Sequence, residues 1–131
     1  KNYKNHILAT NEGSAVSLGI GKYLSTQKVP VVYMQNSGLS NALNPLISIA
    51  HEKVYSIPLI LIIGWRGSPK VNDEPQHNVK GKITESILKL LNIKYTIFLS
   101  FGFIFFFNQL LFFIFHMHFK PSVLFPNKMQ Y

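Results

Sequence analysis

The chain has 131 residues, a length that suits a single domain, and it contains no cysteine, which excludes a disulfide framework and a thiolate metal site. Its formal net charge is +8, from 13 lysine and arginine residues against 5 aspartates and glutamates. The basic residues are scattered singly, and no helix-turn-helix or zinc-finger pattern accompanies them. We therefore expect no nucleic-acid partner.

The composition changes abruptly near residue 98. All 11 phenylalanines lie at or after Phe98, whereas all 5 acidic residues lie before it. A break of this kind indicates two segments of different origin or environment. We therefore divide the chain into residues 1–97 and residues 98–131. The first part starts with a lysine in the middle of a pattern, and we expect it to be an incomplete domain.

The first predicted elements surround a turn. Residues 7–9 form a short apolar run that predicts a strand, and residues 14–25 carry apolar side chains at helical spacing. Between them, Asn11 is a candidate N-cap of the helix. This places Glu12 in the first helical turn, where the helix dipole favours a carboxylate.

The next elements are a strand, a loop and a helix. Residues 29–34 form a continuous apolar run with β-branched side chains, which predicts a strand buried on both faces, as in a parallel sheet. The loop 35–41 is rich in turn-forming and hydrogen-bonding residues. Asn44 and Pro45 are typical of a cap followed by proline at the first helical position, so we expect a helix to begin there.

The last part before the break predicts two more strands and a helix. Residues 57–63 predict a buried strand, which ends at the motif Gly64-Trp65-Arg66-Gly67. A polar loop over residues 68–81 follows, of a length that is usually functional or disordered. Thr84 is then a candidate N-cap, and residues 95–98 predict a final strand. This alternation is typical of an α/β fold with a mainly parallel sheet flanked by helices.

The apolar tail has three interpretations. Residues 96–119 carry no formal charge and are numerous enough to cross a membrane, although Asn108 and Gln109 would be costly there. We favour translated sequence that is not native coding, over a membrane span or a buried element of the fold. The expected location is cytoplasmic, and a membrane location is expected only if this segment is a genuine span. His116 and His118 have no acid or cysteine near them, so we expect no metal site.

Four stretches of the chain resemble one family of enzymes. They are Asn11-Glu12-Gly13-Ser14-Ala15-Val16, residues 28–41, residues 60–67 and Asp73-Glu74-Pro75-Gln76-His77. Over about residues 6–97 the chain is similar to enzymes dependent on thiamine diphosphate (ThDP), and within these to phosphonopyruvate decarboxylases. The resemblance implies part of a pyrimidine-binding domain, and decarboxylation of phosphonopyruvate to phosphonoacetaldehyde. The alternatives are a sulfopyruvate decarboxylase subunit and a catalytically inactive, membrane-anchored or regulatory fragment.

The resemblance implies a catalytic role for Glu12. In the family, a glutamate at this turn hydrogen-bonds N1′ of the cofactor pyrimidine and thereby activates the cofactor. Burial under the cofactor ring should raise the pKa of this carboxyl group, which suits a proton shared with N1′. From the neighbouring residues alone, a capped and solvated glutamate is the alternative.

The resemblance also implies cofactor-binding residues in the loop that follows the second strand. Asn36, Ser37 and Gly38 are the candidates, in a loop similar to the Ser-Gly-Pro-Gly type of the wider superfamily. Leu39 stands where that loop usually has proline. Gly38 would permit close approach of the backbone to cofactor or substrate, and an ordinary strand-to-helix loop is the alternative.

Three residues are candidates for binding the 2-oxo acid substrate. Gln76 and His77 match a segment that reaches the mouth of the active site in the family. Arg66 has a guanidinium group suited to an anionic phosphonate, and a structural ion pair is the alternative role.

The cofactors implied are ThDP and Mg²⁺. In the family, the diphosphate and Mg²⁺ are bound by a second domain with a Gly-Asp-Gly motif, which does not occur in this chain. The expected partner is therefore a second copy in a homo-oligomer, or a chain that carries the diphosphate-binding domain. We expect the polypeptide alone to have no decarboxylase activity.

Overall fold

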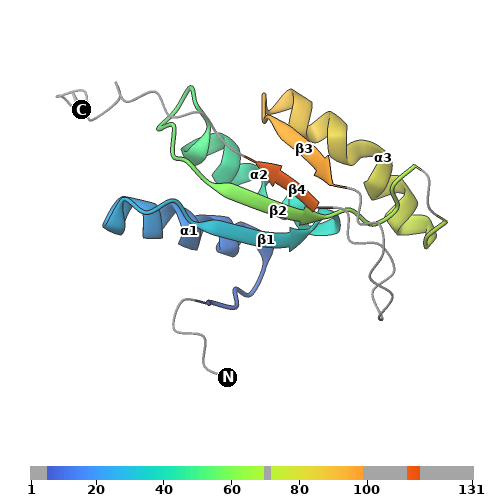
Figure 1. Cartoon of the computed structure of the whole chain (residues 1–131), viewed down its shortest axis with the longest axis horizontal. Helices are drawn as coiled ribbons and strands as arrows, with labels where there is room; N and C mark the ends of the chain where they lie inside the picture. Colours follow the sequence, from blue (N-terminus) through green and yellow to red (C-terminus); the bar gives the residue numbers. More distant parts are fainter. Residues whose placement is uncertain (1–5, 70–71, 99–111, 116–131) are drawn as a thin grey trace.

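The computed structural model describes residues 6–69, 72–98 and 112–115. Its regular elements alternate between helix and strand along most of the chain (Figure 1). The helices are α1 (Glu12–Thr26), α2 (Leu39–Pro45) and α3 (Pro75–Leu90), and the strands are β1 (Val31–Gln35), β2 (Ile60–Gly64), β3 (Tyr95–Phe98) and β4 (Phe112–Phe115). A 3-10 turn, Asn36–Gly38, precedes α2, and a π-helical turn, Leu46–Ala50, follows it.

The strands form one sheet in the order β1-β2-β4-β3. β1 and β2 pair in parallel, with Val31 opposite Ile60 and Gln35 opposite Gly64. β4 is antiparallel to both β2 and β3. It follows that β1, β2 and β3 point in the same direction, and the predicted α/β class is confirmed.

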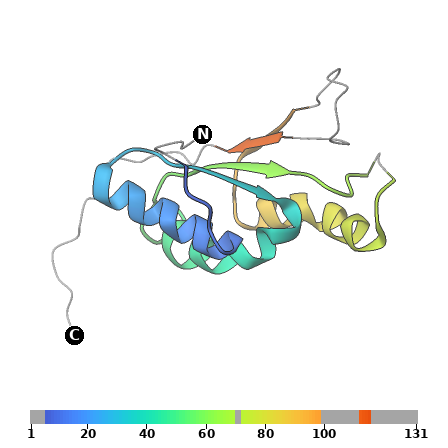
Figure 2. The same cartoon turned by 90° about the horizontal axis from the view of Figure 1, so that it is seen from below.

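The helices lie on one face of the sheet, as Figure 2 shows. α1 buries Val16 and Ile20, and the core continues through α2 and β2 to Leu88 of α3. Gly19 of α1 lies directly on the sheet layer, because a Cβ atom there would be 3.1 Å from Val32 Cγ2. This close contact between helix and strand places one part of the core between α1 and the β1–β2 pair.

The prediction that the strand at residues 29–34 is buried on both faces was wrong. In β1, Val32 and Met34 are buried, whereas the side chains of Val31 and Tyr33 are 58% and 60% exposed. A continuous apolar run hides this alternation, because apolar residues occupy both faces while helices cover only one. Residues 7–9 likewise form no strand, and Leu8 is largely exposed without a partner strand among the described residues.

Two predicted helix starts are also corrected. Asn44 and Pro45 lie inside α2 rather than at a cap, since the helix already begins at Leu39. α3 begins at Pro75, so the predicted loop 68–81 is shorter than expected and Thr84 lies within the helix. Proline at the first helical turn was the signal for this start, because its missing N–H costs nothing there.

The final strand predicted at residues 95–98 is confirmed as β3. Two stretches of residues 96–119, for which a membrane span was one of three interpretations, belong to β3 and β4, which are strands of the sheet. The rest of residues 96–119, with His116 and His118, lies outside the described residues. Within the described parts of the chain, no helix combines the length and apolarity needed to cross a membrane.

Candidate active site

Glu12 occupies the position at the start of α1 that the sequence predicts. The Asn11 side chain caps the helix, since its Oδ1 accepts a hydrogen bond from the Ser14 backbone N–H at 2.8 Å. The Asn11 backbone is extended, which turns the incoming chain away from the helix axis. Glu12 is therefore the first residue of the helix, and its side chain is half-buried.

The Glu12 carboxylate lies against the start of α2. Asn41 Nδ2 donates a hydrogen bond to Glu12 Oε2 at 2.9 Å. The Glu12 side chain also lies over the backbone of Gly38, because a Cβ atom on Gly38 would be only 2.0 Å from Glu12 Cδ. We call Glu12, Gly38 and Asn41 the Glu12 site. Gly38 thus permits a close approach, and the group that approaches it in this chain is the glutamate itself.

The pKa of Glu12 is lowered from the usual glutamate value. The largest cause is the hydrogen bond from Asn41, followed by the Glu12 backbone N–H, while partial burial acts in the opposite direction. The raised pKa expected from the resemblance refers to a carboxyl group covered by a cofactor ring. In the chain alone, the ionised form is favoured, so Glu12 is a hydrogen-bond acceptor at neutral pH.

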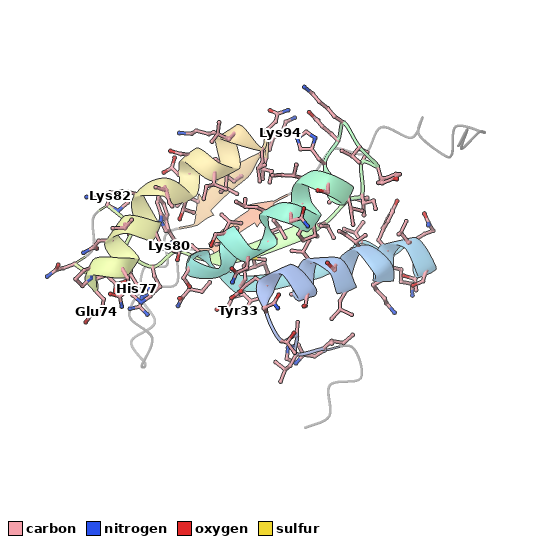
Figure 3. The ribbon with its side chains drawn as sticks, turned by 180° about the vertical axis from the view of Figure 1, so that it is seen from behind. Tyr33, Glu74, His77, Lys80, Lys82 and Lys94 are labelled. Carbon is pink, nitrogen blue, oxygen red and sulfur yellow. The ribbon has the colours of Figure 1, made fainter. Side chains whose placement is uncertain are left out.

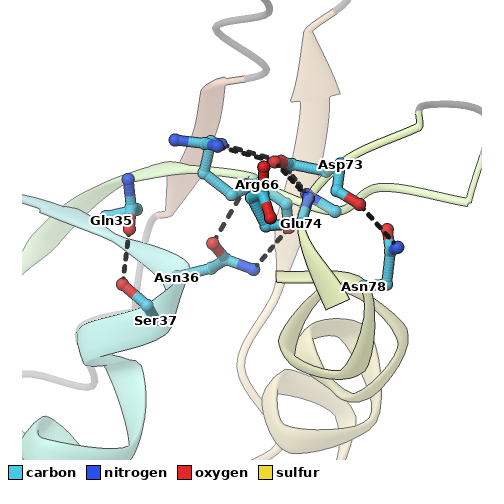
Figure 4. Close-up of polar contacts among 8 residues, drawn as sticks. Gln35, Asn36, Ser37, Arg66, Asp73, Glu74 and Asn78 are labelled. Carbon is cyan, nitrogen blue, oxygen red and sulfur yellow. Dashed lines mark hydrogen bonds and ion pairs between the residues drawn. The ribbon is translucent and has the colours of Figure 1, made fainter. Parts of the chain in front are cut away.

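Asn36 is a buried link between three segments. It is 3% exposed, and its Oδ1 accepts from the Arg66 backbone N–H at 3.0 Å. Its Nδ2 donates to the Arg66 carbonyl at 3.0 Å (Figure 4) and to Thr84 Oγ1, also at 3.0 Å. Both amide hydrogens are therefore used, and the Asn36 side chain has no donor left for a cofactor. Ser37, the next candidate, donates its hydroxyl hydrogen to Gln35 Oε1 at 2.6 Å.

Arg66 forms the structural ion pair that was the alternative to substrate binding. Its Nε and Nη2 donate to the two carboxylate oxygens of Asp73 at 2.7 and 2.6 Å (Figure 4). The Arg66 guanidinium is the main cause that holds the pKa of Asp73 well below its usual range, with the Glu74 and Gly67 backbone N–H groups adding to it. Because this bidentate pair already neutralises Arg66, an anionic substrate would have to compete with Asp73.

The turn after β2 also depends on two glycines. Gly67 has φ of +65°, and a Cβ atom there would be 1.9 Å from the His77 carbonyl oxygen. A Cβ atom on Gly81 would be 1.7 Å from the Gly67 carbonyl oxygen. Trp65 Nε1 donates to the Gly81 carbonyl at 2.9 Å. The motif at residues 64–67 thus fits tightly onto α3, and these packing contacts explain Gly67 without a ligand.

The remaining predicted substrate residues lie at the start of α3. Gln76 is exposed, and His77 is half-buried with its Nδ1 enclosed and unpaired among the described residues. No hydrogen bond between described residues joins either of them to Glu12. Lys80, which Figure 3 labels on α3, does connect this helix to the site's surroundings, since its Nζ donates to Ser40 Oγ at 3.1 Å.

Asn41 is the site residue that sequence reasoning missed. It closes the loop in which Asn36, Ser37 and Gly38 were singled out, yet nothing local marks it. Its contact with Glu12 joins residues 29 positions apart. Only the packing of the first turn of α1 against α2 brings the two side chains together.

Residues 2–87 match the family model described as the thiamine pyrophosphate enzyme, N-terminal TPP binding domain. The chain belongs to the thiamine pyrophosphate enzymes. Thiamine pyrophosphate is another name for ThDP, so the family predicted from the sequence is confirmed.

The relatives of this ThDP-family chain are decarboxylases of two kinds. It is 37% identical to a phosphonopyruvate decarboxylase of Streptomyces viridochromogenes over 92 residues, which are 70% of this chain and 22% of that protein. It is also 37% identical to a sulfopyruvate decarboxylase subunit alpha of Methanococcus maripaludis over 90 residues, or 69% of this chain and 52% of that subunit. The chain thus spans about a fifth of the first and about half of the second. No solved structure matches it.

The described residues fit one part of the family's cofactor. The Glu12 carboxylate is half-buried, and Asn41 supplies one of the about four hydrogen bonds that a carboxylate can accept. It can therefore accept another from a donor such as a pyrimidine ring. For a metal ion, no group of three suitable His, Asp or Glu side chains is present among the described residues.

Proposed function

We propose that this chain supplies the pyrimidine-binding side of a ThDP-dependent decarboxylase that acts on phosphonopyruvate, with phosphonoacetaldehyde and CO2 as products. The supporting observation is the Glu12 site, where a carboxylate is fixed at the first turn of α1 against a bare glycine backbone. This is the type of acceptor that the cofactor of the family needs, and it lies within the segment that the family model matches.

The residues of this chain have defined roles in the proposal. ThDP supplies, when bound, the electron sink for decarboxylation. Glu12 accepts a hydrogen bond from the pyrimidine and holds the shared proton at its carboxylate. Gly38 leaves room for that carboxylate, and Asn36 fixes the loop on which Gly38 lies. Gln76 and His77 are proposed to contact the substrate from the start of α3.

Sulfopyruvate is the second candidate substrate. A relative named for it reaches the same identity, 37%, as one named for phosphonopyruvate. Both compounds are 2-oxo acids with a second anionic group. Arg66 is the proposed contact for this group, although it would have to be shared with Asp73.

The proposal requires a partner for the chain. The diphosphate and Mg²⁺ are assigned to a second domain, from another copy in a homo-oligomer or from a separate chain. Relatives named as subunit alpha support an assembly of more than one chain. We expect the purified polypeptide alone to release no CO2 from phosphonopyruvate with ThDP and Mg²⁺.

A chimera tests the proposed function. The matched 92-residue segment of the Streptomyces viridochromogenes relative is replaced by the corresponding residues of this chain. CO2 release from phosphonopyruvate and sulfopyruvate is then measured with ThDP and Mg²⁺. We expect turnover of phosphonopyruvate, and a loss of about 10²–10⁴-fold in the Glu12→Gln chimera, a range typical of a general acid–base group.

Two results would change the proposal. If the folded chimera binds ThDP and the Glu12→Gln substitution leaves its rate of CO2 release unchanged, Glu12 has no part in catalysis. A clear preference of the chimera for sulfopyruvate would favour the second substrate.

A further inference from the structure

We infer that Asn41 is a positioning residue for Glu12. The Asn41 side-chain amide, together with the bare backbone of Gly38, holds the Glu12 carboxylate in its acceptor orientation. The inference rests on the proposed function for the claim that Glu12 serves the cofactor. The contacts themselves stand on the geometry of the described residues.

The starts of α1 and α2 approach each other through a reciprocal pair of glycines. A Cβ atom on Gly13 would be 2.6 Å from the Asn41 carbonyl oxygen, and one on Gly38 would be 2.0 Å from Glu12 Cδ. Gly38 has φ of −87°, so it is needed for its missing side chain and not for an unusual backbone. Asn41 of α2 therefore packs against Gly13 of α1, and Glu12 of α1 packs against Gly38 at the start of α2.

Pro45 contributes to this close approach. Proline has no backbone N–H, so it cannot donate to the Asn41 carbonyl four residues earlier, as an ordinary helical residue would. The Asn41 carbonyl is thereby released from the usual helical ladder at the point where it meets Gly13. The main chain of Asn41 is fixed against α1, and its side chain is directed to Glu12.

A neutral amide, rather than a cation, holds the carboxylate. The two ion pairs between described residues are Arg66–Asp73 and Lys89–Glu85, and neither involves Glu12. From α3, Lys80 is bonded to Ser40, which is next to Asn41 in α2. An amide donor fixes the orientation of the carboxylate without neutralising it, so Glu12 can still accept a proton shared with a ligand.

The test is a carboxyl ¹³C NMR titration of the full chain, without cofactor or substrate. In Asn41→Ala, we expect the pKa of Glu12 to rise toward the ordinary glutamate value, because its largest lowering cause is removed. In Gly38→Ala, we expect the same direction, because the new Cβ displaces the carboxylate from Asn41. Glu85, which accepts from Tyr95 at 2.6 Å, is the internal reference and should not change.

Asn44→Ala is the matched control. Asn44 lies in the same helix, and its Oδ1 accepts from Ser48 Oγ at 2.9 Å. If both variants fold and the pKa of Glu12 in Asn41→Ala equals the pKa of Glu12 in Asn44→Ala and in the original chain, the inference is overturned. In the active chimera, Asn41→Ala should lower kcat more than it raises KM, and should shift the acid limb of the pH profile upward.

The two proposals fail separately. If the pKa of Glu12 rises in Asn41→Ala as expected but the chimera is inactive, the proposed function is overturned and the Asn41–Glu12 contact is established. An active chimera whose Glu12 does not respond to Asn41→Ala would overturn the positioning role alone.

Discussion

Asp73 is the side chain on which the turn after β2 depends. Its carboxylate accepts two hydrogen bonds from Arg66, and one each from the Gly67 and Glu74 backbone N–H groups at 3.0 and 2.9 Å. The Asp73 side chain is 11% exposed, and the Arg66 side chain is 38% exposed. These bonds all favour the ionised form, so the turn is expected to weaken when Asp73 is protonated.

The first prediction concerns acid stability. The folded pKa of Asp73 is well below the unfolded value of about 3.9. The stabilisation is therefore fully present above that unfolded value, and it is lost as the pH falls below it. We expect Asp73→Asn to lower the free energy of unfolding at pH 7, and to flatten its decline between about pH 4 and pH 2. Urea unfolding at several pH values measures both effects.

The control for this prediction is Glu74→Gln. Glu74 is exposed, and its side chain makes no capping hydrogen bond to α3. We expect this variant to keep the acid response of the original chain. If Asp73→Asn and the original chain lose stability equally between about pH 4 and pH 2, the Arg66–Asp73 pair contributes nothing measurable.

The role of a single residue could be predicted from the sequence where its hydrogen-bond partner lies only a few positions away along the chain. The Asn11 cap was found because its partner, Ser14, is three residues away. Asn36 was assigned to the right loop, but its partners Arg66 and Thr84 lie 30 and 48 residues away. No local pattern reveals that its amide is buried, and so its structural role became visible only in the fold.

The contact between α3 and the turn after β2 could not be predicted from the sequence. Thr84 resembled an N-cap, but within α3 its hydroxyl donates to the Lys80 carbonyl at 2.7 Å and accepts from Asn36. A threonine hydroxyl serves either role, so its type alone cannot place a helix start. Gly67 and Gly81 lie at the two ends of the predicted loop, but nothing in the sequence shows that they face each other.

The second prediction tests this contact with glycine-to-alanine variants. Gly67→Ala would place alanine at φ of +65° and against the His77 carbonyl. We expect it to lower the free energy of unfolding by about 1–3 kcal/mol from backbone strain alone, with the steric clash adding to this. Gly81→Ala should also destabilise, because its Cβ meets the Gly67 carbonyl oxygen, a backbone atom that cannot move freely.

Gly21→Ala is the matched control for these variants. It lies in α1, and a Cβ atom there meets nothing within 4 Å among the described residues. Alanine is favoured over glycine in a helix interior by about 0.5–1 kcal/mol, so this variant should be more stable. Equal effects of all three substitutions on chemical denaturation would show that the close packing of Gly67 and Gly81 is not needed for stability.

The whole molecule has one covered face and one open face in its described part. The alternation of strands and helices predicted the α/β class, because this pattern requires helices to cross between parallel strands. It did not predict that α1, α2 and α3 all lie on the same side of the sheet (Figure 2). The open side includes the exposed Val31 and Tyr33 of β1. Coverage of a face depends on where each crossover passes, and the apolar runs do not encode this.

The last prediction concerns the part of the chain after the composition break. β4 lies between β2 and β3, and it pairs Ile114 with both Ile62 and Thr96. Deleting residues 99–131 would remove this middle strand. We expect the amides of β3 to lose protection from hydrogen exchange, because β4 is its neighbour in the sheet. The amides that bond β1 and β2 to each other should keep their protection, since this parallel pair shares its core with α1 and α2.

Deleting only residues 116–131 provides the control, because it leaves β4 in place. We expect this shorter deletion to preserve the protection of β3 in hydrogen exchange followed by mass spectrometry. If both deletions leave β3 equally protected, then β4 is not needed for the sheet, and residues 99–131 are separable from the domain. If the longer deletion removes protection from β1 and β2 as well, the apolar segment is an integral part of the core.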